Sequence, residues 1–279
     1  MILIADSGAT KTNWCLVRAH SDYRIVQTEG INPFHQTEEK ISGTICRDLM
    51  SQLSKEDVDS CTEVHFFGAG CLPVNSGIII GQLLSCFPQA TVTADTDLLG
   101  AAHAVCGHNP GIACILGTGS NSCLYDGARI VKNVSPLGYI LGDEGSGAYL
   151  GKRFIGDCLK GLLPATLKKG LFREFGLTQA TILQRVYMQP EANRFLGSVV
   201  PYIYDNRHVP EVAALLDDCF REFFRRNVVG YSSDMPVSFT GSVAWFFQEE
   251  VTRAAQAAGL KVGRFVRNPI EGMVEYYFS

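Results

Sequence analysis

The sequence predicts an α/β protein in which one structural plan occurs twice. Residues 1–17 place an apolar run, a polar turn with glycine and a second apolar run in succession, which is typical of a β-hairpin. Residues 112–125 repeat this plan about one domain length later. The chain has 279 residues, 46% of them hydrophobic and 19% charged, which is enough for two globular domains of ordinary size. We therefore predict two duplicated α/β domains.

The turn of the first hairpin carries groups that suit a metal-bound phosphate. Gly8 lets the backbone approach a ligand closely, and successive N–H groups in such a turn can form an anion-binding nest. Asp6 can hold a hard cation, directly or through water. The remaining candidate phosphate contacts in this turn are Ser7, Thr10, Lys11 and Thr12. Taken alone, these residues are equally compatible with an ordinary polar hairpin tip.

The turn of the second hairpin repeats the combination of glycine and hydroxyl groups. It reads Gly117-Thr118-Gly119-Ser120-Asn121, between an apolar run at 112–116 and another at 123–125. Two such turns, facing one another, could grip a polyphosphate from both sides. We therefore predict nucleotide contacts at Gly117, Thr118 and Gly119.

Between the two hairpins the residue pattern alternates between strands and helices. Strands are predicted at 23–29, 63–70 and 90–94, and helices at 36–57, 78–87 and 98–105. The turn cluster at 107–111, Gly-His-Asn-Pro-Gly, is the best domain boundary in the chain. The predicted domains are residues 1–107 and residues 108–279.

Asp97 follows the predicted strand 90–94 and directly precedes the predicted helix 98–105. In open α/β sheets, ligands collect at the carboxyl ends of strands and at the N-termini of the helices that follow. Asp97 therefore lies where chemistry is expected. Either Asp95 or Asp97 could instead be a simple N-cap of the helix.

The second half of the chain offers two further candidate segments. Residues 142–147, Gly-Asp-Glu-Gly-Ser-Gly, cannot form a stable helix or strand interior, so they form either a flexible acidic loop or a ligand-lining loop with Asp143. A strand at 237–240 runs into Gly241 and Ser242, where a flat base could lie against the backbone, although close helix–strand packing needs the same small residues. Helices are predicted over 154–230 and 269–278, and a last strand at 262–266.

Composition excludes several classes of function. The formal charge of −4 gives no electrostatic footprint for nucleic acid or an anionic membrane. We expect no signal peptide, because Asp6 interrupts the short apolar N-terminal run, and no run approaches the about 20 residues that cross a bilayer. The ten cysteines form no C-x-x-C pair and fall mostly in apolar surroundings, so we expect small core residues in a reducing cytoplasm. A disulfide framework or a zinc site is not expected.

Together these motifs resemble the actin/sugar-kinase/heat-shock-protein ATPase superfamily. The resemblance is closest to the N-acetylglucosamine kinase-like branch of the BadF/BadG/BcrA/BcrD-type ATPase family. It is carried by Thr96-Asp97, by the segments 117–121 and 142–146, and by Gly241-Ser242-Val243-Ala244. The implied fold is two ribonuclease H-like (actin-like ATPase) domains with an interdomain cleft, and the C-terminal helix packs back on the first domain.

The resemblance also implies a reaction, in which ATP phosphorylates a hydroxyl of an amino sugar, N-acetylglucosamine or glucosamine. Asp97 would be the catalytic base, Asp6 would hold Mg²⁺, and Gly241 and Ser242 would hold the adenosine. The implied sugar contacts are Asn32, Asp97, Ser120, Asn121, Gly138 and Asp143. An Asn in a turn before Pro is also common without any ligand. No residue distinguishes between the candidate sugars.

Two other functions remain open. One is an ATPase activator of a CoA-ester dehydratase or reductase, which needs cysteines from a Gly-rich segment for an iron–sulfur cluster, and residues 68–71 are a distant candidate. The other is a sugar sensor without catalysis, against which the presence of Asp97 argues. The helical region 154–230 is expected to supply core, cleft wall and a face for a homodimer.

Overall fold

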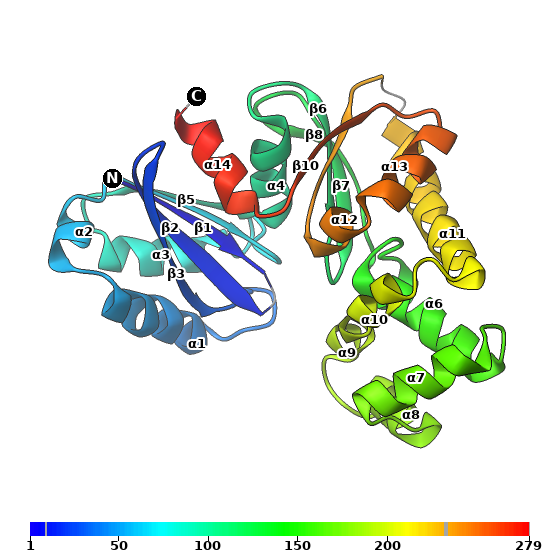
Figure 1. Cartoon of the computed structure of the whole chain (residues 1–279). Helices are drawn as coiled ribbons and strands as arrows, with labels where there is room; N and C mark the ends of the chain where they lie inside the picture. The colour runs from blue at the N-terminus through cyan, green and yellow to red at the C-terminus, as the bar shows by residue number, and fades with distance from the viewer. Residues whose placement is uncertain (9, 232–233, 279) are drawn as a thin grey trace. The chain divides into compact units, whose positions relative to one another are not determined.

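The computed structural model describes residues 1–8, 10–231 and 234–278, and it divides the chain into two compact units (Figure 1). The first unit comprises residues 1–109, 127–130 and 268–279, and the second comprises residues 110–126 and 131–267. Each unit is built around one five-stranded sheet. The main division, between Asn109 and Pro110, lies in the turn cluster at 107–111.

The sheet of the first unit has the order β3-β2-β1-β4-β5. Its strands are β1 (Ile2–Ser7), β2 (Lys11–Ala19), β3 (Asp22–Glu29), β4 (Glu63–Gly68) and β5 (Thr91–Thr96). The first three are antiparallel, whereas β4 runs parallel to both β1 and β5. In this register Asp6 lies opposite Phe67, which lies opposite Asp95. The carboxyl ends of β1, β4 and β5 therefore meet at one edge of the sheet.

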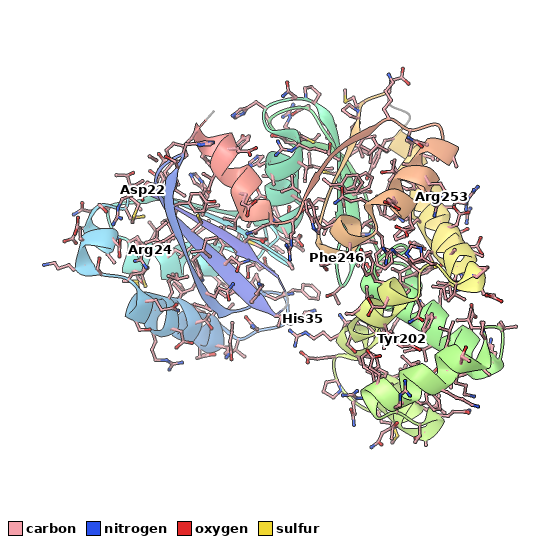
Figure 2. The ribbon with its side chains drawn as sticks, in the orientation of Figure 1. Asp22, Arg24, His35, Tyr202, Phe246 and Arg253 are labelled. Carbon is pink, nitrogen blue, oxygen red and sulfur yellow. The ribbon has the colours of Figure 1, made fainter. Side chains whose placement is uncertain are left out.

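The helices of the first unit are α1 (Glu38–Ser42), the π-helix η1 (Gly43–Leu49), the 3₁₀-helix η2 (Met50–Gln52), α2 (Lys55–Asp59), α3 (Ser76–Cys86), α4 (Asp97–Cys106) and α14 (Pro269–Phe278). The prediction of one helix over 36–57 is wrong. Leu53 is extended, and Ser54 starts α2 with a capping box to Asp57. Asp57 also pairs with Arg24 of β3 and Arg18 of β2, and Arg24 is labelled in Figure 2.

The terminal helix α14 packs against α4, as Figure 1 shows. The ring of Tyr276 stacks on that of His103, with centroids 3.9 Å apart and planes within 5°. Gly272 permits this approach, because a Cβ there would lie 2.3 Å from the carbonyl oxygen of Ala104. The chain thus returns to its first unit at its last helix.

The sheet of the second unit has the order β10-β9-β6-β7-β8. Its strands are β6 (Gly111–Leu116), β7 (Ser120–Tyr125), β8 (Ile130–Val134), β9 (Val237–Thr240) and β10 (Val262–Val266). The hairpin of β6 and β7 and the parallel strands β9 and β10 confirm the predicted strands. Strand β8 was not predicted, because its five residues at the sheet edge have no buried position to give a hydrophobic alternation.

Helices form the remainder of the second unit. They are α5 (Gly138–Leu141), α6 (Gly147–Lys160), α7 (Ala165–Phe175), α8 (Gln179–Tyr187), α9 (Ala192–Ser198), α10 (Val200–Asp205), α11 (Pro210–Asn227), the 3₁₀-helix η3 (Val229–Tyr231), α12 (Ser242–Phe246) and α13 (Gln248–Ala257). Tyr202, labelled in Figure 2, packs among them and donates a hydrogen bond of 2.9 Å to the carbonyl oxygen of Leu167. The predicted α/β class is confirmed. In the described ranges, no helix has the length and apolar character that a membrane crossing requires.

Candidate functional site

The turn between β1 and β2 exposes Gly8, Thr10 and Lys11 at its tip. The N–H of Gly8 donates to the carbonyl oxygen of Lys11 at 3.0 Å, which closes the turn. Ala9 lies outside the described residues. The exposed part of this turn therefore offers one hydroxyl and one ammonium group to an anion.

The side chains of Ser7 and Thr12, which were predicted to contact a nucleotide, bond to the protein itself. Both side chains are fully buried, and their hydroxyl oxygens lie 2.7 Å apart. The Ser7 hydroxyl also exchanges hydrogen bonds of 3.0 Å with the backbone of Ile31, and that of Thr12 donates to the carbonyl oxygen of Glu29 at 3.1 Å. These hydroxyls hold the turn against the chain that follows β3, because a buried hydroxyl needs a partner.

Asp6 and Asp97 form the acidic centre of the first unit. Burial raises the pKa of Asp6 to about 7, with a further rise from the charge of Asp97 and an opposing effect of Lys11. Burial also raises the pKa of Asp97 to about 6, against the backbone N–H groups at the start of α4. The cap of α4 is neither Asp95 nor Asp97 but Thr96, whose hydroxyl accepts from the N–H of Leu99 at 3.2 Å.

The residues of this centre fit a magnesium ion that arrives with ATP. Burial raises the pKa of Asp6, and a divalent cation beside this carboxylate would oppose the rise. Over the described ranges, no group of three or more His, Cys, Asp or Glu side chains could hold a metal.

Asn32 lies in the loop between β3 and α1. Its side-chain oxygen accepts from the N–H of Phe34 at 2.9 Å, so the turn expected of an Asn before Pro is present. The loop after β4 lies directly against it, because a Cβ on Gly70 would be 2.3 Å from that oxygen. Gly70 has a φ of +73°. The side-chain amide of Asn32 is the group that remains for a substrate.

In the second unit, the turn between β6 and β7 is fixed to the N-terminus of α6. The N–H of Gly117 donates to the carbonyl oxygen of Gly119 at 2.9 Å. The N–H groups of Gly147 and Ala148 donate to the carbonyl oxygens of Gly117 and Thr118 at 2.8 and 3.0 Å. Backbone hydrogen bonds therefore fix the turn to α6.

The structure brings Asp143 against this turn but directs Asn121 elsewhere. A carboxylate oxygen of Asp143 accepts from the N–H of Ser120 at 3.3 Å, and the φ of Asp143 is +55°. Burial raises the pKa of Asp143. The side-chain oxygen of Asn121 instead accepts from the N–H of Ser122 and the side chain of Asn133 on β8. Gly138 is the first residue of α5 and has a φ of +73°. Its predicted contact with the sugar stays a prediction.

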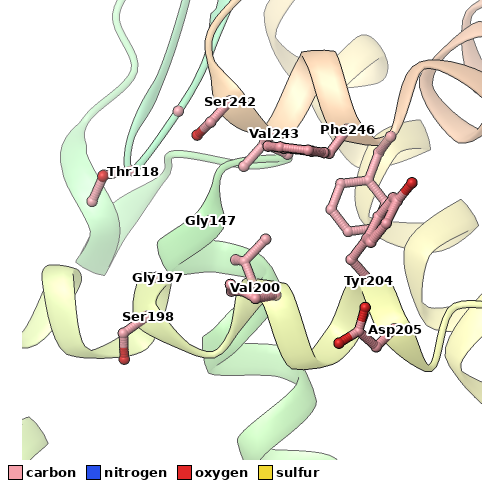
Figure 3. Close-up of a pocket in the computed structure, with 13 residues that line it drawn as sticks. Thr118, Gly147, Gly197, Ser198, Val200, Tyr204, Asp205, Ser242, Val243 and Phe246 are labelled. Carbon is pink, nitrogen blue, oxygen red and sulfur yellow. The ribbon is translucent and has the colours of Figure 1, made fainter.

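A pocket of about 330 Å³ lies beside the same turn. Figure 3 shows Thr118 at one end and Tyr204, Asp205 and Phe246 at the other, with Ser242 between them. The rings of Tyr204 and Phe246 meet edge to face at 5.7 Å. Gly241, with a φ of +102°, lets α12 begin against β6, because a Cβ there would be 2.4 Å from the carbonyl oxygen of Leu116.

Sequence reasoning missed the wall of this pocket that α9 and α10 supply. Phe246 and Phe247, which follow the predicted turn at 241–244, were also missed. The missed residues of the wall itself are Gly197, Ser198, Val200, Pro201, Tyr204 and Asp205. The helical region 154–230 contains no motif that singles them out. The one usable signal was Pro201 in the first turn of α10, which marks the helix boundary at the pocket wall.

Comparisons with known proteins agree with this architecture. No family model matches the sequence, and no curated protein is significantly similar to it. The structure of a proposed N-acetylglucosamine kinase from Porphyromonas gingivalis is 43% identical, with a TM-score of 0.96 over 100% of this chain and 99% of that one. A second proposed N-acetylglucosamine kinase, from Chromobacterium violaceum, is 19% identical, with a TM-score of 0.69 over 99% of this chain and 98% of that one.

A ROK family glucokinase from Streptomyces griseus, in complex with glucose and AMPPNP, is 12% identical, with a TM-score of 0.58 over 98% of this chain and 97% of that one. At this identity, and at that of the Chromobacterium protein, the likeness shows the fold alone, which is the predicted pair of actin-like ATPase domains. The likeness to the Porphyromonas protein reaches further, because it combines high identity with full coverage of both chains. The chain belongs to the N-acetylglucosamine kinase-like branch of the BadF/BadG/BcrA/BcrD-type ATPase family, as its motifs predicted.

Proposed function

We propose that this protein is a kinase that transfers the γ-phosphoryl group of ATP to a hydroxyl of an amino sugar, N-acetylglucosamine or glucosamine. The observation that carries the proposal is the pocket of the second unit. Its lining changes from the backbone of the turn between β6 and β7 at one end to aromatic rings at the other. A nucleoside polyphosphate has the same gradient, from anion to flat aromatic base.

In this proposal the phosphates of ATP lie at Gly117, Thr118 and Gly119, and the adenosine lies along Gly241 and Ser242. The absence of side chains at the glycines lets backbone N–H groups approach phosphate oxygens. Tyr204 and Phe246 then flank the base. Gly8, Thr10 and Lys11 of the first unit contribute further phosphate contacts.

Asp97 is proposed as the base that accepts the proton of the sugar hydroxyl. With a pKa of about 6, its carboxyl is ionised at pH 7 and can orient the hydroxyl. A strongly basic group is not needed, because little covalent chemistry falls to the protein in phosphoryl transfer and positioning dominates. A magnesium ion on the phosphates, held partly by Asp6, would neutralise the charge that develops during transfer.

The proposed sugar contacts are Asn32, Ser120, Asn121, Gly138 and Asp143, together with Asp97. Asn32 would donate its side-chain amide, because its oxygen is engaged by the N–H of Phe34. Asp143 would accept from a sugar hydroxyl, because the hydrogen bond that its carboxylate accepts from the N–H of Ser120 is long, at 3.3 Å. Asn121 has the weakest support, since its oxygen already accepts two hydrogen bonds.

The alternative of an iron–sulfur ATPase activator has less support. Cys71, at the end of its candidate segment, is fully buried, and burial raises the pKa of this thiol to about 11. A cluster ligand must be a thiolate that reaches the metal. A sugar sensor without catalysis would bind both ligands but release no ADP.

The decisive experiment is a panel of sugars with ATP and magnesium, scored by sugar-dependent ADP release. N-acetylglucosamine, glucosamine, N-acetylmannosamine and glucose are compared with a reaction without sugar, and phosphorus NMR identifies the phosphorylated hydroxyl. We expect release with the first or second sugar, at least about tenfold above the reaction without sugar. ADP release that is independent of every sugar would contradict the proposal and favour the ATPase activator.

We also propose that the enzyme works in the cytoplasm, where ATP is available, and that it is a homodimer. The formal charge of −4 gives no electrostatic footprint for nucleic acid or an anionic membrane. Light scattering coupled to size-exclusion chromatography would measure the mass in solution. A mass near the 30.5 kDa of one chain would refute the dimer.

A further inference from the structure

Two thiols outside the proposed active site touch one another in the first unit. The sulfur of Cys46, in η1, lies 3.0 Å from that of Cys86, the last residue of α3. Seven of the ten cysteines are buried, as their apolar surroundings predicted, and Cys106 is half-buried. Cys46 is the one exposed cysteine among the ten, all of which the structure describes. The most accessible thiol therefore has a second thiol in contact with it.

The contact is fixed by packing and not by chance proximity on a mobile loop. Helix η1 packs on α3, and the sulfur of Cys46 lies 3.8 Å from the carbonyl oxygen of Gln82 in that helix. Its sulfur is 3.6 Å from the hydroxyl of Ser85 and 3.6 Å from the side-chain oxygen of Gln82. Gln82 is also bonded to Glu38 of α1. Both sulfurs are thus held in place by the packing of η1 against α3 within the first unit.

The two thiols differ in reactivity. Burial raises the pKa of Cys86 to about 12, and its contact with Cys46 adds to the rise. Thiolates, not thiols, attack disulfides, so the exposed Cys46 must react first. Once the sulfur of Cys46 is bonded to another sulfur, it can no longer carry a charge, and its contribution to the high pKa of Cys86 disappears. The reaction of Cys46 therefore makes it easier for Cys86 to lose its proton and react in the second step.

We propose that Cys46 and Cys86 are an oxidisable pair that forms a reversible disulfide with a low-molecular-weight disulfide such as oxidised glutathione. The thiolate of Cys46 attacks one sulfur of glutathione disulfide, whose S–S bond breaks, and one glutathione leaves as a thiolate that takes up a proton. Cys86 loses its proton to water and attacks the sulfur of Cys46, which releases the second glutathione. Two protein thiols are oxidised and one glutathione disulfide is reduced to two thiols.

The cross-link would restrain a large part of the first unit. It joins η1 to the end of α3 across residues 46–86, a segment that includes strand β4 and helix α2. A disulfide that closes a long loop restricts the unfolded chain more than the folded one. Since the sulfurs are already in contact, the native fold need move little. The oxidised protein should therefore melt at a higher temperature than the reduced protein, by several degrees.

The test uses the full-length protein, reduced and then incubated with oxidised glutathione at pH 8. Remaining thiols are alkylated and the peptides are mapped by mass spectrometry without reduction. We expect the loss of two thiols, one Cys46–Cys86 cross-linked peptide and a raised melting temperature that dithiothreitol reverses. Cys86→Ser should instead retain one glutathione on Cys46, and Cys46→Ser should lose no thiol. Cys106→Ser, which removes the other half-buried thiol of the unit, should form the same cross-link as the parent.

The proposal does not depend on the kinase activity, so the outcome of the sugar panel has no bearing on it. It is overturned if the parent protein keeps all ten thiols, or if it carries glutathione on Cys46 without progressing to the cross-link. A cross-link that involves any other pair of cysteines would also overturn it. Because the parent protein gives these readouts by itself, a variant that fails to fold leaves the test intact.

Discussion

Burial and the negative charge of Asp97 together raise the pKa of Asp6 to about 7. The two carboxyls come from different elements, since Asp6 belongs to β1 and Asp97 opens α4. The parallel pairing of β1, β4 and β5 brings both elements to one edge of the sheet. Such a pair suits two different roles, because a cation can neutralise one carboxylate while the other stays available to a proton.

The pKa values predict an acid limb in the activity. A catalytic base must be ionised, and the pKa of Asp97 is about 6, above the ordinary value of 3.8. The value of kcat/KM for the sugar should therefore rise with pH and level off above about pH 7, because this quantity reports the free enzyme. The measurement is kcat/KM between pH 5 and 9 at saturating MgATP. A profile that is flat down to pH 5 would exclude a base with this pKa.

Asp97→Asn should lower kcat by about 10²–10⁴-fold, which is the usual contribution of a positioned general base. The amide keeps the shape of the side chain but cannot accept the proton. The dissociation constant of ATP, measured by calorimetry, should change little, because Asp97 is assigned to the acceptor. Asp95→Asn is the matched control, since Asp95 is exposed and its carboxylate accepts from the N–H of Thr96. Retention of more than a tenth of the turnover would remove Asp97 from the role of base.

The same variant has a second readout in stability. A carboxyl whose pKa is raised on folding binds more protons in the folded than in the unfolded state between about pH 4 and 6, so stability falls as pH rises through this window. Asn carries no such charge. The melting temperature of Asp97→Asn should therefore exceed that of the parent at pH 8, and the difference should vanish below about pH 4. A lower melting temperature at pH 8 would show that the fold requires the carboxylate.

Sequence reasoning located the ends of strands well, because glycine and hydroxyl clusters interrupt buried runs wherever a strand meets a turn. The turn at Gly117 and the start of α12 at Ser242 were found in this way, and both line the pocket. The same reasoning did not show that the side chains of Ser7 and Thr12 are buried. A hydroxyl in a polar turn can face a ligand or the protein, and only the fold decides which, here by burying both side chains.

The far wall of the pocket could not be predicted for a different reason. Tyr204 and Phe246 are far apart in sequence and meet only when α10 packs beside α12 (Figure 3). Neither residue lies in a motif. Helical periodicity alone would place Tyr204 in the hydrophobic core of the second unit. The break of the helix over 36–57 was also missed, since a capping box at Ser54 outweighs the apolar spacing on either side of it.

Gly119→Val should raise the dissociation constant of ATP by about tenfold or more, equivalent to about 1.4 kcal/mol. Even a Cβ at this position would be 3.2 Å from a carboxylate oxygen of Asp143, so two further methyl groups must displace either that carboxylate or the phosphates. Gly230→Ala is a control in the same unit, because its Cβ would meet nothing within 4 Å. Unchanged ATP affinity in a folded Gly119→Val protein would reduce this loop to a simple turn.

Asn32→Asp should raise the KM for the sugar by about 2- to 10-fold, the effect of one lost hydrogen bond to an uncharged group. The carboxylate can still accept from the N–H of Phe34, so the turn is kept and only the amide donor is removed. Asn109→Asp, at an exposed position of the same unit, introduces the same charge as a control. Kinetics at saturating ATP provide the measurement. A KM equal to that of the parent would remove Asn32 from the sugar site.

Phe246→Ala tests which end of the pocket receives the base. The ring of Phe246 is 48% exposed, so its removal leaves the core intact, and it meets the ring of Tyr204 at 5.7 Å. Stacking of a base on an aromatic side chain contributes about 1–3 kcal/mol, which corresponds to a rise of about 5- to 150-fold in the dissociation constant of ATP. Tyr187→Ala is the matched control, because this ring is 79% exposed and lies outside the pocket. The affinity for inorganic triphosphate, which has no base, should be equal in parent and variant. If Phe246→Ala weakens triphosphate as much as ATP, the ring supports the phosphate end and the nucleotide lies in the opposite direction.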